Sequence, residues 1–256
     1  ANGSSFTVMN AAVDDLYSAA SQYLKSVNPT EIWKPFDLSF YLINPDINKN
    51  LDGWTGGGNY TSSVCDFSNQ KFDFNQTTTE KLPAGTYALH VSAFQRPGAY
   101  DATYTDFVTN GVNNVDVSIY AKAKTAPIQH IWAAPQESSL GGTTKKYNGL
   151  YIPNNGLAAS KWFAAGFYDN AVMLTTTSSA TMKVGIKGNN TGTDYWTAFD
   201  NFRLYFYGQY SIDDVVTPVK SITTEPSDDC YYDLQGRRVA RPTRGRYIKN
   251  GKKILF

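Results

Sequence analysis

The chain has 256 residues, of which 14% are aromatic and 18% charged, and its formal net charge is +1. This length suits one all-β sandwich with small appendages, because such sandwiches often form single domains of roughly 200 to 250 residues. The balanced charge excludes a global field that would attract nucleic acid or an anionic membrane. No apolar run approaches the ~20 residues of a membrane-spanning helix.

The N-terminal segment is predicted to be helical. Apolar residues recur at helical spacing from Val8 to Val27, and Asn28-Pro29 is a stop signal. The opening Ala-Asn-Gly-Ser-Ser lacks the basic and apolar regions of a signal peptide, so for an exported protein we expect the signal to have been removed. Residues 1–35 are assigned to this segment.

The next 180 or so residues, 36–214, are predicted to form an antiparallel β-sandwich, since no βαβ alternation is present. In the last expected strand, Asp200, Phe202, Leu204 and Phe206 alternate onto one face. The expected strands are 36–43, 71–79, 86–94, 115–121, 171–177, 181–187 and 197–208.

Three connections are longer or richer in turn residues than a sandwich requires. Residues 44–54 form a turn-rich loop that ends in Trp54. Loops 96–114 and 125–167 are predicted to carry function or extra helices, and residues 157–166 have the composition of a short helix. Within that helix we expect Trp162 and Phe163 to be core residues.

The C-terminal residues, 215–256, are predicted to be a linker followed by a small β module. Two hairpins are expected, with turns at Gln235-Gly236 and Asn250-Gly251. From Pro218 onward, nine Lys and Arg residues face four Asp and Glu residues, so this module is basic. It is too small for a secure core of its own and should pack on the sandwich or on a partner.

The cysteine and histidine residues indicate neither a disulfide framework nor a catalytic site. Cys65 and Cys230 are far apart in the sequence and do not indicate a disulfide framework. His90 and His130 are isolated from any recognisable nucleophile, so the sequence does not support a catalytic triad. A two-carboxylate glycosidase remains open, with the candidate acids Asp52, Asp101, Asp106, Asp169, Asp194 and Asp200, although solvated loop acids are the simpler interpretation.

Sugar recognition usually combines an aromatic platform with a few polar groups, and the predicted loops supply both. The alternative is that the aromatic residues belong to the core and that Arg96 fixes the loop beside Pro97-Gly98. The candidate ligand-binding residues are Trp54, Arg96, Tyr100, Asp101, Tyr104, Trp132 and Trp196.

A family resemblance rests on four motifs that follow one another along the chain. They are Ile43-Asn-Pro-Asp-Ile with Asp52-Gly-Trp54, Leu82-Pro-Ala-Gly-Thr-Tyr-Ala-Leu89, Ala93-Phe-Gln-Arg-Pro-Gly98 and Phe199-Asp-Asn-Phe-Arg-Leu204. They resemble the galactose-binding-like jelly-roll modules of secreted Bacteroidetes glycan-handling proteins, over about residues 37 to 210. The resemblance implies a jelly-roll β-sandwich, attached to a glycoside hydrolase or surface protein, whose commonest activity is carbohydrate binding.

The same resemblance implies a structural calcium where the first loop meets the last strand, with Asp46, Asn48 and Asp200 at the matching positions. Asn48 stands where many relatives have Glu, which removes one charge. Alternatively, Asp200 accepts backbone hydrogen bonds at the strand. No other cofactor is expected.

The tail motifs Tyr232-Asp-Leu-Gln-Gly-Arg-Arg-Val239 and Pro242 to Ile254 resemble type IX secretion sorting modules, which implies a secreted or cell-surface protein. We therefore predict a noncatalytic module that binds a polysaccharide or glycoconjugate, or interacts at the cell surface, with a catalytic or surface protein as partner. The alternatives are a purely structural spacer for a catalytic partner and, third, a glycoside hydrolase.

Overall fold

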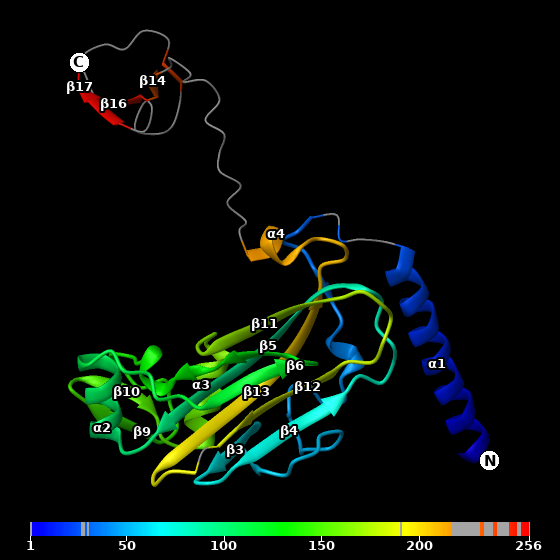
Figure 1. Cartoon of the computed structure of the whole chain (residues 1–256), viewed down its shortest axis with the longest axis horizontal. Helices are drawn as coiled ribbons and strands as arrows, with labels where there is room; N and C mark the ends of the chain where they lie inside the picture. The colour runs from blue at the N-terminus through cyan, green and yellow to red at the C-terminus, as the bar shows by residue number, and fades with distance from the viewer. Residues whose placement is uncertain are drawn as a thin grey trace. The chain divides into compact units, whose positions relative to one another are not determined.

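The computed structural model describes residues 2–26, 29, 31–189 and 191–216, together with the short strands 231–232, 238–239, 246–249 and 252–255. The chain divides into two compact units, residues 1–215 and 216–256. Figure 1 follows the chain through both units.

Two antiparallel sheets form the body of the larger unit (Figure 1). The first sheet has the order β11-β5-β13-β3-β2, with β1 added along β13 and β8 added along β5 in parallel. Its strands are β1 (Phe36–Asp37), β2 (Asn59–Thr61), β3 (Val64–Ser68), β5 (Gly85–Pro97), β8 (Gln129–His130), β11 (Asp169–Thr176) and β13 (Tyr195–Phe206). The second sheet has the order β4-β12-β6-β7, formed by β4 (Phe72–Thr77), β6 (Val117–Ala121), β7 (Lys124–Pro127) and β12 (Lys183–Gly188).

The main core lies between these sheets and follows from strand alternation. Leu89 and Val91 of β5 and Val184 and Ile186 of β12 are fully buried in the same cluster. Their polar neighbours on each strand face outward, as the period of two requires. The predicted all-β antiparallel sandwich with an N-terminal helix is confirmed.

A second core covers the outer face of the first sheet at one end, which we call the loop end. Phe94 of β5 and Trp196 of β13 point into it, and Trp162 and Phe163 are buried there as predicted. The covering elements are α2 (Tyr100–Tyr104), the π-helical turn η2 (Thr105–Thr109), η3 (Ile131–Ala133), the hairpin of β9 (Thr144–Tyr147) and β10 (Leu150–Pro153), and α3 (Gly156–Ala164). The long loops therefore hold a helix and a hairpin of their own.

Helix α1 (Asn2–Ser26) contacts the sandwich through its C-terminal half. The hydroxyl of Tyr17 donates to the carbonyl of Phe40 at 3.2 Å, and Leu24 is buried. Met9 and Leu16 remain exposed. No helix among the described residues is long and apolar enough to cross a membrane.

The strand predicted at 36–43 is wrong beyond its first two residues. After β1, Asp37 Oδ1 accepts a hydrogen bond from Ser39 N at 2.9 Å, and the chain turns into the 3-10 helix η1 (Ser39–Tyr41). A side-chain acceptor two residues earlier offers the backbone an alternative to a strand ladder.

The predicted alternation along β13 is also wrong at Asp200. The pairing places Asp200 opposite Ser92 but Arg203 opposite His90, so β13 carries one extra residue. Asn201 provides this β-bulge with φ of 54°, a left-handed conformation that Asn tolerates. Asp200 and Arg203 therefore occupy the outer face, whereas Phe202 lies in the core.

The larger unit ends near α4 (Ile212–Val216). In the smaller unit, β14 (Tyr231–Tyr232), β15 (Arg238–Val239), β16 (Arg246–Lys249) and β17 (Lys252–Leu255) pair in the order β15-β14-β16-β17, and Tyr247 is buried. The predicted turns at 235–236 and 250–251, most of the linker, and Cys230 lie outside the described residues.

Candidate functional site

Arg96 is the centre of the loop end. It lies near the end of β5, directly opposite Trp196 of β13, so both side chains lie on the outer face of the first sheet. The guanidinium carbon is 4.2 Å from the ring centre of Tyr100 and 5.7 Å from that of Trp196. These distances are those of cation–π contacts, which hold the guanidinium against the two rings.

Polar contacts fix Arg96 further. Its Nε donates to the backbone carbonyl of Asp194 at 3.1 Å, and its Nη1 makes a long 3.5 Å contact with Asn154 Oδ1. Burial lowers the pKa of Arg96, while Tyr100 and Asp194 act in the opposite direction. The guanidinium therefore links β5, α2, the residue that follows β10, and the turn before β13.

Tyr100 is shared by two cations. Lys145 of β9 has its Nζ 5.2 Å from the Tyr100 ring centre. Burial raises the pKa of Tyr100, and Arg96 partly offsets that increase through its charge and a hydrogen bond. We call Arg96, Tyr100, Lys145 and Asn154 the loop-end site.

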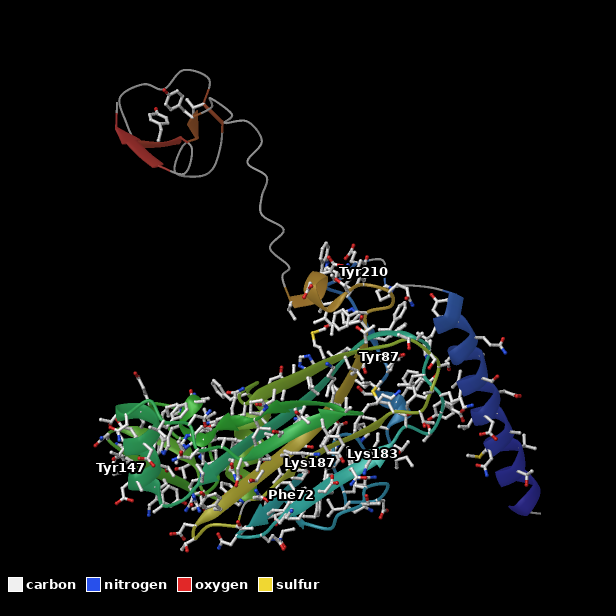
Figure 2. The ribbon with its side chains drawn as sticks, viewed as in Figure 1. Phe72, Tyr87, Tyr147, Lys183, Lys187 and Tyr210 are labelled. Atoms are coloured by element: carbon white, nitrogen blue, oxygen red, sulfur yellow. The ribbon has the colours of Figure 1, made fainter. Side chains whose placement is uncertain are left out.

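Tyr104 and Trp132 adjoin this site but belong to the second core. The Tyr104 ring packs edge-on against Trp132, with ring centres 5.1 Å apart, and lies tilted against Tyr147, labelled in Figure 2, at 4.9 Å. The indole N–H of Trp132 donates to Thr103 Oγ1 at 3.1 Å. Asp101 is exposed on α2, where its carboxylate accepts from Ala102 N.

The three tryptophans predicted as ligand platforms are buried. Trp54 lies apart from the loop-end site, stacked 4.7 Å from Phe74, with its N–H donating to the carbonyl of Asn44. Trp132 is 2% exposed and Trp196 is 7% exposed. The structure thus brings Arg96, Tyr100 and Trp196 together directly, with Tyr104 and Trp132 alongside.

Sequence reasoning missed Lys145 and Asn154. A signal for their position was present, because Asn148-Gly149 is a hairpin turn pair between the β-patterned segments 144–147 and 150–153. The contact of this hairpin with β5 and α2 is long-range, and no local pattern encodes it.

The predicted calcium residues Asp46 and Asp200 lie near the bulge of β13. Asp46 forms an ion pair with Arg203. Among the described residues, Oδ1 of Asp46 and Oδ1 of Asp200 are buried without a hydrogen-bond partner of good geometry. The pKa of Asp200 is raised from 3.8 to about 8, mainly by burial and also by the Asp46 charge, while a hydrogen bond from the Asn201 backbone and the Arg203 charge act in the opposite direction.

Calcium binds six to eight oxygens, and a buried carboxylate oxygen without a partner, such as Asp200 Oδ1, suits such a hard cation, whereas Asp46 Oδ1 already contacts the Arg203 guanidinium. Asp46 and Asp200 would supply two of these ligands, whereas Arg203 competes for the same negative charge. Asn48 is exposed, and its carbonyl accepts from Tyr60 Oη at 2.7 Å. Within the described residues no group of three or more His, Cys, Asp or Glu side chains could hold a metal ion, so calcium at Asp46 and Asp200 stays a proposal.

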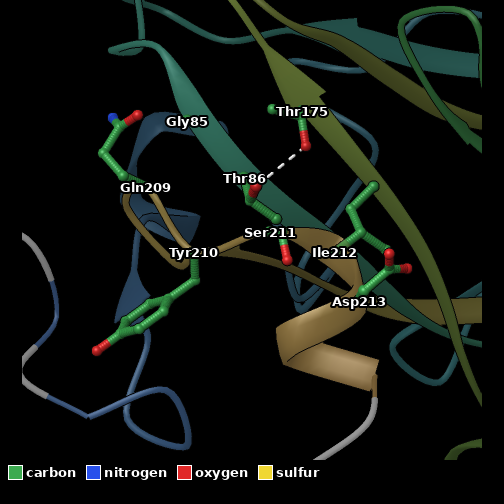
Figure 3. Close-up of a pocket in the computed structure, with 8 residues that line it drawn as sticks. All are labelled: Gly85, Thr86, Thr175, Gln209, Tyr210, Ser211, Ile212 and Asp213. Atoms are coloured by element: carbon green, nitrogen blue, oxygen red, sulfur yellow. Dashed lines mark hydrogen bonds between the residues drawn. The ribbon is translucent and has the colours of Figure 1, made fainter.

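Two hollows lie away from the loop end. One of about 330 Å³ is formed where the end of the sandwich meets α4; Thr86 and Thr175 share a 3.0 Å hydrogen bond on its wall (Figure 3). The other, of about 450 Å³, lies on the second sheet, where Figure 2 labels Phe72 and Lys187. There Tyr120 Oη donates to Asp73 Oδ1 at 2.6 Å.

No protein-family model matches this chain, and no curated protein does. Eleven chains of solved structures match. One is the structure of TmCBM61 in complex with β-1,4-galactotriose, which is 15% identical, with 65% of this chain and 97% of that chain covered, at a TM-score of 0.29. At that TM-score the likeness supports no conclusion about this chain. Its class, an antiparallel β-sandwich with a helix-and-hairpin cap, rests on the strand pairing.

Proposed function

We propose that this chain is a noncatalytic carbohydrate-binding module whose ligand, a polysaccharide or glycoconjugate, binds at the loop-end site. The supporting observation is that Arg96 of β5 and Lys145 of β9 both contact the Tyr100 ring of α2, while Asn154, which follows β10, contacts the Arg96 guanidinium. Sugar sites need a few placed polar groups beside aromatic surface, and this arrangement supplies both.

A binding titration tests this function. Calorimetry against neutral and acidic glycans of plant, host and microbial origin should give a measurable Kd for at least one polymer. Arg96→Lys keeps the charge but loses the planar fork, so it should weaken binding about 10-fold or more, since a hydrogen bond to a charged group contributes ~1.5–3 kcal/mol. Lys187→Gln, on the second sheet, is the control and should change Kd less than twofold.

A purely structural spacer is the second candidate, and the burial of Trp54, Trp132 and Trp196 favours it. A spacer needs no open aromatic platform. If no glycan binds the wild-type chain, or if Lys187→Gln weakens binding as much as Arg96→Lys, the loop-end proposal is wrong.

Hydrolysis has less support. His90 Nδ1 lies 2.9 Å from Asp169 Oδ2, but among the described contacts no Ser or Cys side chain hydrogen-bonds to this histidine. Of the candidate carboxylates, Asp200 has a raised pKa, and it lies buried beside Asp46 and Arg203. Neither arrangement is a nucleophile with a base or an open pair of acids.

We also propose that the protein acts outside the cytoplasm, at the cell surface or as a secreted part of a glycan-handling protein. The support is the resemblance of segments 232–239 and 242–254 to type IX sorting modules of Bacteroidetes. A fusion of residues 216–256 to a periplasmic reporter should reach the surface of a cell that has this secretion system. Retention in the periplasm would contradict a sorting role.

A further inference from the structure

The loop-end site holds two cations for which the described residues provide no carboxylate partner. Among the described residues, ion pairs join Lys34 to Glu31 and Arg203 to Asp46, and His90 hydrogen-bonds to Asp169; none of these contacts involves Arg96 or Lys145. Arg96 instead contacts a backbone carbonyl, an amide oxygen and aromatic rings. Lys145 stands over the same Tyr100 ring and is exposed.

The nearby acids Asp194 and Asp101 form no ion pair with Arg96 or Lys145. Asp194 contributes its backbone carbonyl to Arg96, and its exposed carboxylate acts on the guanidinium only through space. Asp101 is directed to its own backbone, where it accepts from Ala102 N at 2.9 Å. Neither carboxylate lies within ion-pair distance of Arg96 or Lys145 in the described structure.

Arg96 also has donors to spare. A guanidinium carries five N–H donors. The Asp194 carbonyl accepts one at 3.1 Å and Asn154 Oδ1 another at 3.5 Å, which leaves three for Tyr100 and for a ligand. Because the fork matches a planar or tetrahedral oxyanion, and a half-buried cation gains most from a negatively charged partner, an anionic ligand group suits this position better than a neutral hydroxyl.

We propose that the loop-end site selects glycans that carry an anionic substituent, a uronate carboxylate or a sulfate ester, held between Arg96 and Lys145. This inference rests on the carbohydrate-binding function proposed above. It also assigns a role to Tyr100: with a cation near its ring from β5 and another from β9, the ring orients the two charges.

The test compares two pairs of polymers, each of which contains a charged and a neutral member. Calorimetric titration of the whole chain uses polygalacturonate with its methyl ester, and a sulfated galactan that carries no carboxylate with neutral galactan. Polygalacturonate should bind at least about 10-fold more tightly than its methyl ester, which corresponds to one charge-assisted hydrogen bond of ~1.5–3 kcal/mol. The sulfated galactan distinguishes sulfate from carboxylate because it carries only sulfate, and added NaCl should weaken the binding of the charged polymers only.

Lys145→Gln and Lys146→Gln form a matched pair. Both lysines are exposed and adjacent, but Lys146 stands 5.1 Å from Tyr151 instead of Tyr100. Lys145→Gln should reduce the acid-to-ester affinity ratio about fivefold or more, whereas Lys146→Gln should leave it unchanged. Thermal unfolding checks that both variants fold.

The outcomes separate the two proposals. Equal affinity for acid and ester, with no tighter binding of the sulfated polymer, overturns anionic selection but leaves carbohydrate binding standing. An equal decrease of the acid-to-ester affinity ratio in both lysine variants also overturns anionic selection at this site, because the effect then depends only on the net charge of the protein. If none of the four polymers binds, anionic selection is wrong, and the broader glycan panel then decides the proposed function by itself.

Discussion

Replacing Asp200 with Asn should stabilise the larger unit at alkaline pH. The Asp200 side chain is 7% exposed, and its pKa rises to about 8 in the folded chain against ~3.9 in an unfolded one. Because the folded pKa is the higher one, the folded state holds the extra proton. The resulting stability is complete below about pH 4 and is lost as pH rises towards 8.

The size of the stabilisation by D200N follows from the pKa shift of Asp200. About four pKa units at ~1.4 kcal/mol each set an upper limit of roughly 5.5 kcal/mol, and local relaxation around Arg203 and Asp46 should reduce it. We expect D200N to exceed the wild type by roughly 2–3 kcal/mol at pH 8, or about 5–10 °C in Tm for a unit of this size. At pH 4.5 the free energies of unfolding of D200N and the wild type should differ by much less.

Tryptophan fluorescence in EDTA is the assay, because all five Trp residues lie in the larger unit. Asp15→Asn on α1 is the control, since Asp15 is exposed. A Tm difference between D200N and wild type that is the same at both pH values, or a D200N variant less stable at pH 8, would refute the reasoning.

Three further predictions follow from the same contacts. Calcium should raise the Tm of the wild type at pH 8 by mass action and leave D200N unchanged; an equal rise in both variants would exclude Asp200 as a ligand. Burial lowers the pKa of His130 to about 4, so its ring resonances in NMR should not shift between pH 7 and 5.5, and its contribution to stability should be lost only as pH falls from about 6.5 towards 4. Trp162→Ala should cost about 3–5 kcal/mol in denaturant unfolding, whereas Trp33→Ala, at a side chain that is 72% exposed, should cost less than ~0.5 kcal/mol.

The regular parts of the fold were predictable from local pattern. The alternation of β5 and the helix-forming run of α3 both appear in the structure, with Asn155 Oδ1 capping α3 by accepting from Ala158 N at 2.9 Å. Each of these features depends on residues within a few positions of one another, so a single sequence contains the information.

The bulge at Asn201 and the assembly of the loop-end site were not predictable in this way. One residue in a left-handed conformation reverses the alternation for Asp200, and nothing in Phe199-Asp-Asn-Phe distinguishes that strand from a regular one. Arg96 and Asn154 are 58 positions apart and meet only through tertiary packing. The burial of Trp54 was equally ambiguous, because tryptophan serves cores and sugar platforms alike.

The central claim is that ligand binds at the loop end, and NMR mapping tests it most directly. Polygalacturonate added to the labelled chain should shift the Arg96 Nε–Hε signal and the backbone amides of Lys145 and Asn154 more than any others. If the largest chemical-shift changes occurred instead at Asp73 and Lys187, the ligand would bind in the hollow on the second sheet. An unchanged Arg96 signal at saturating ligand would contradict the account.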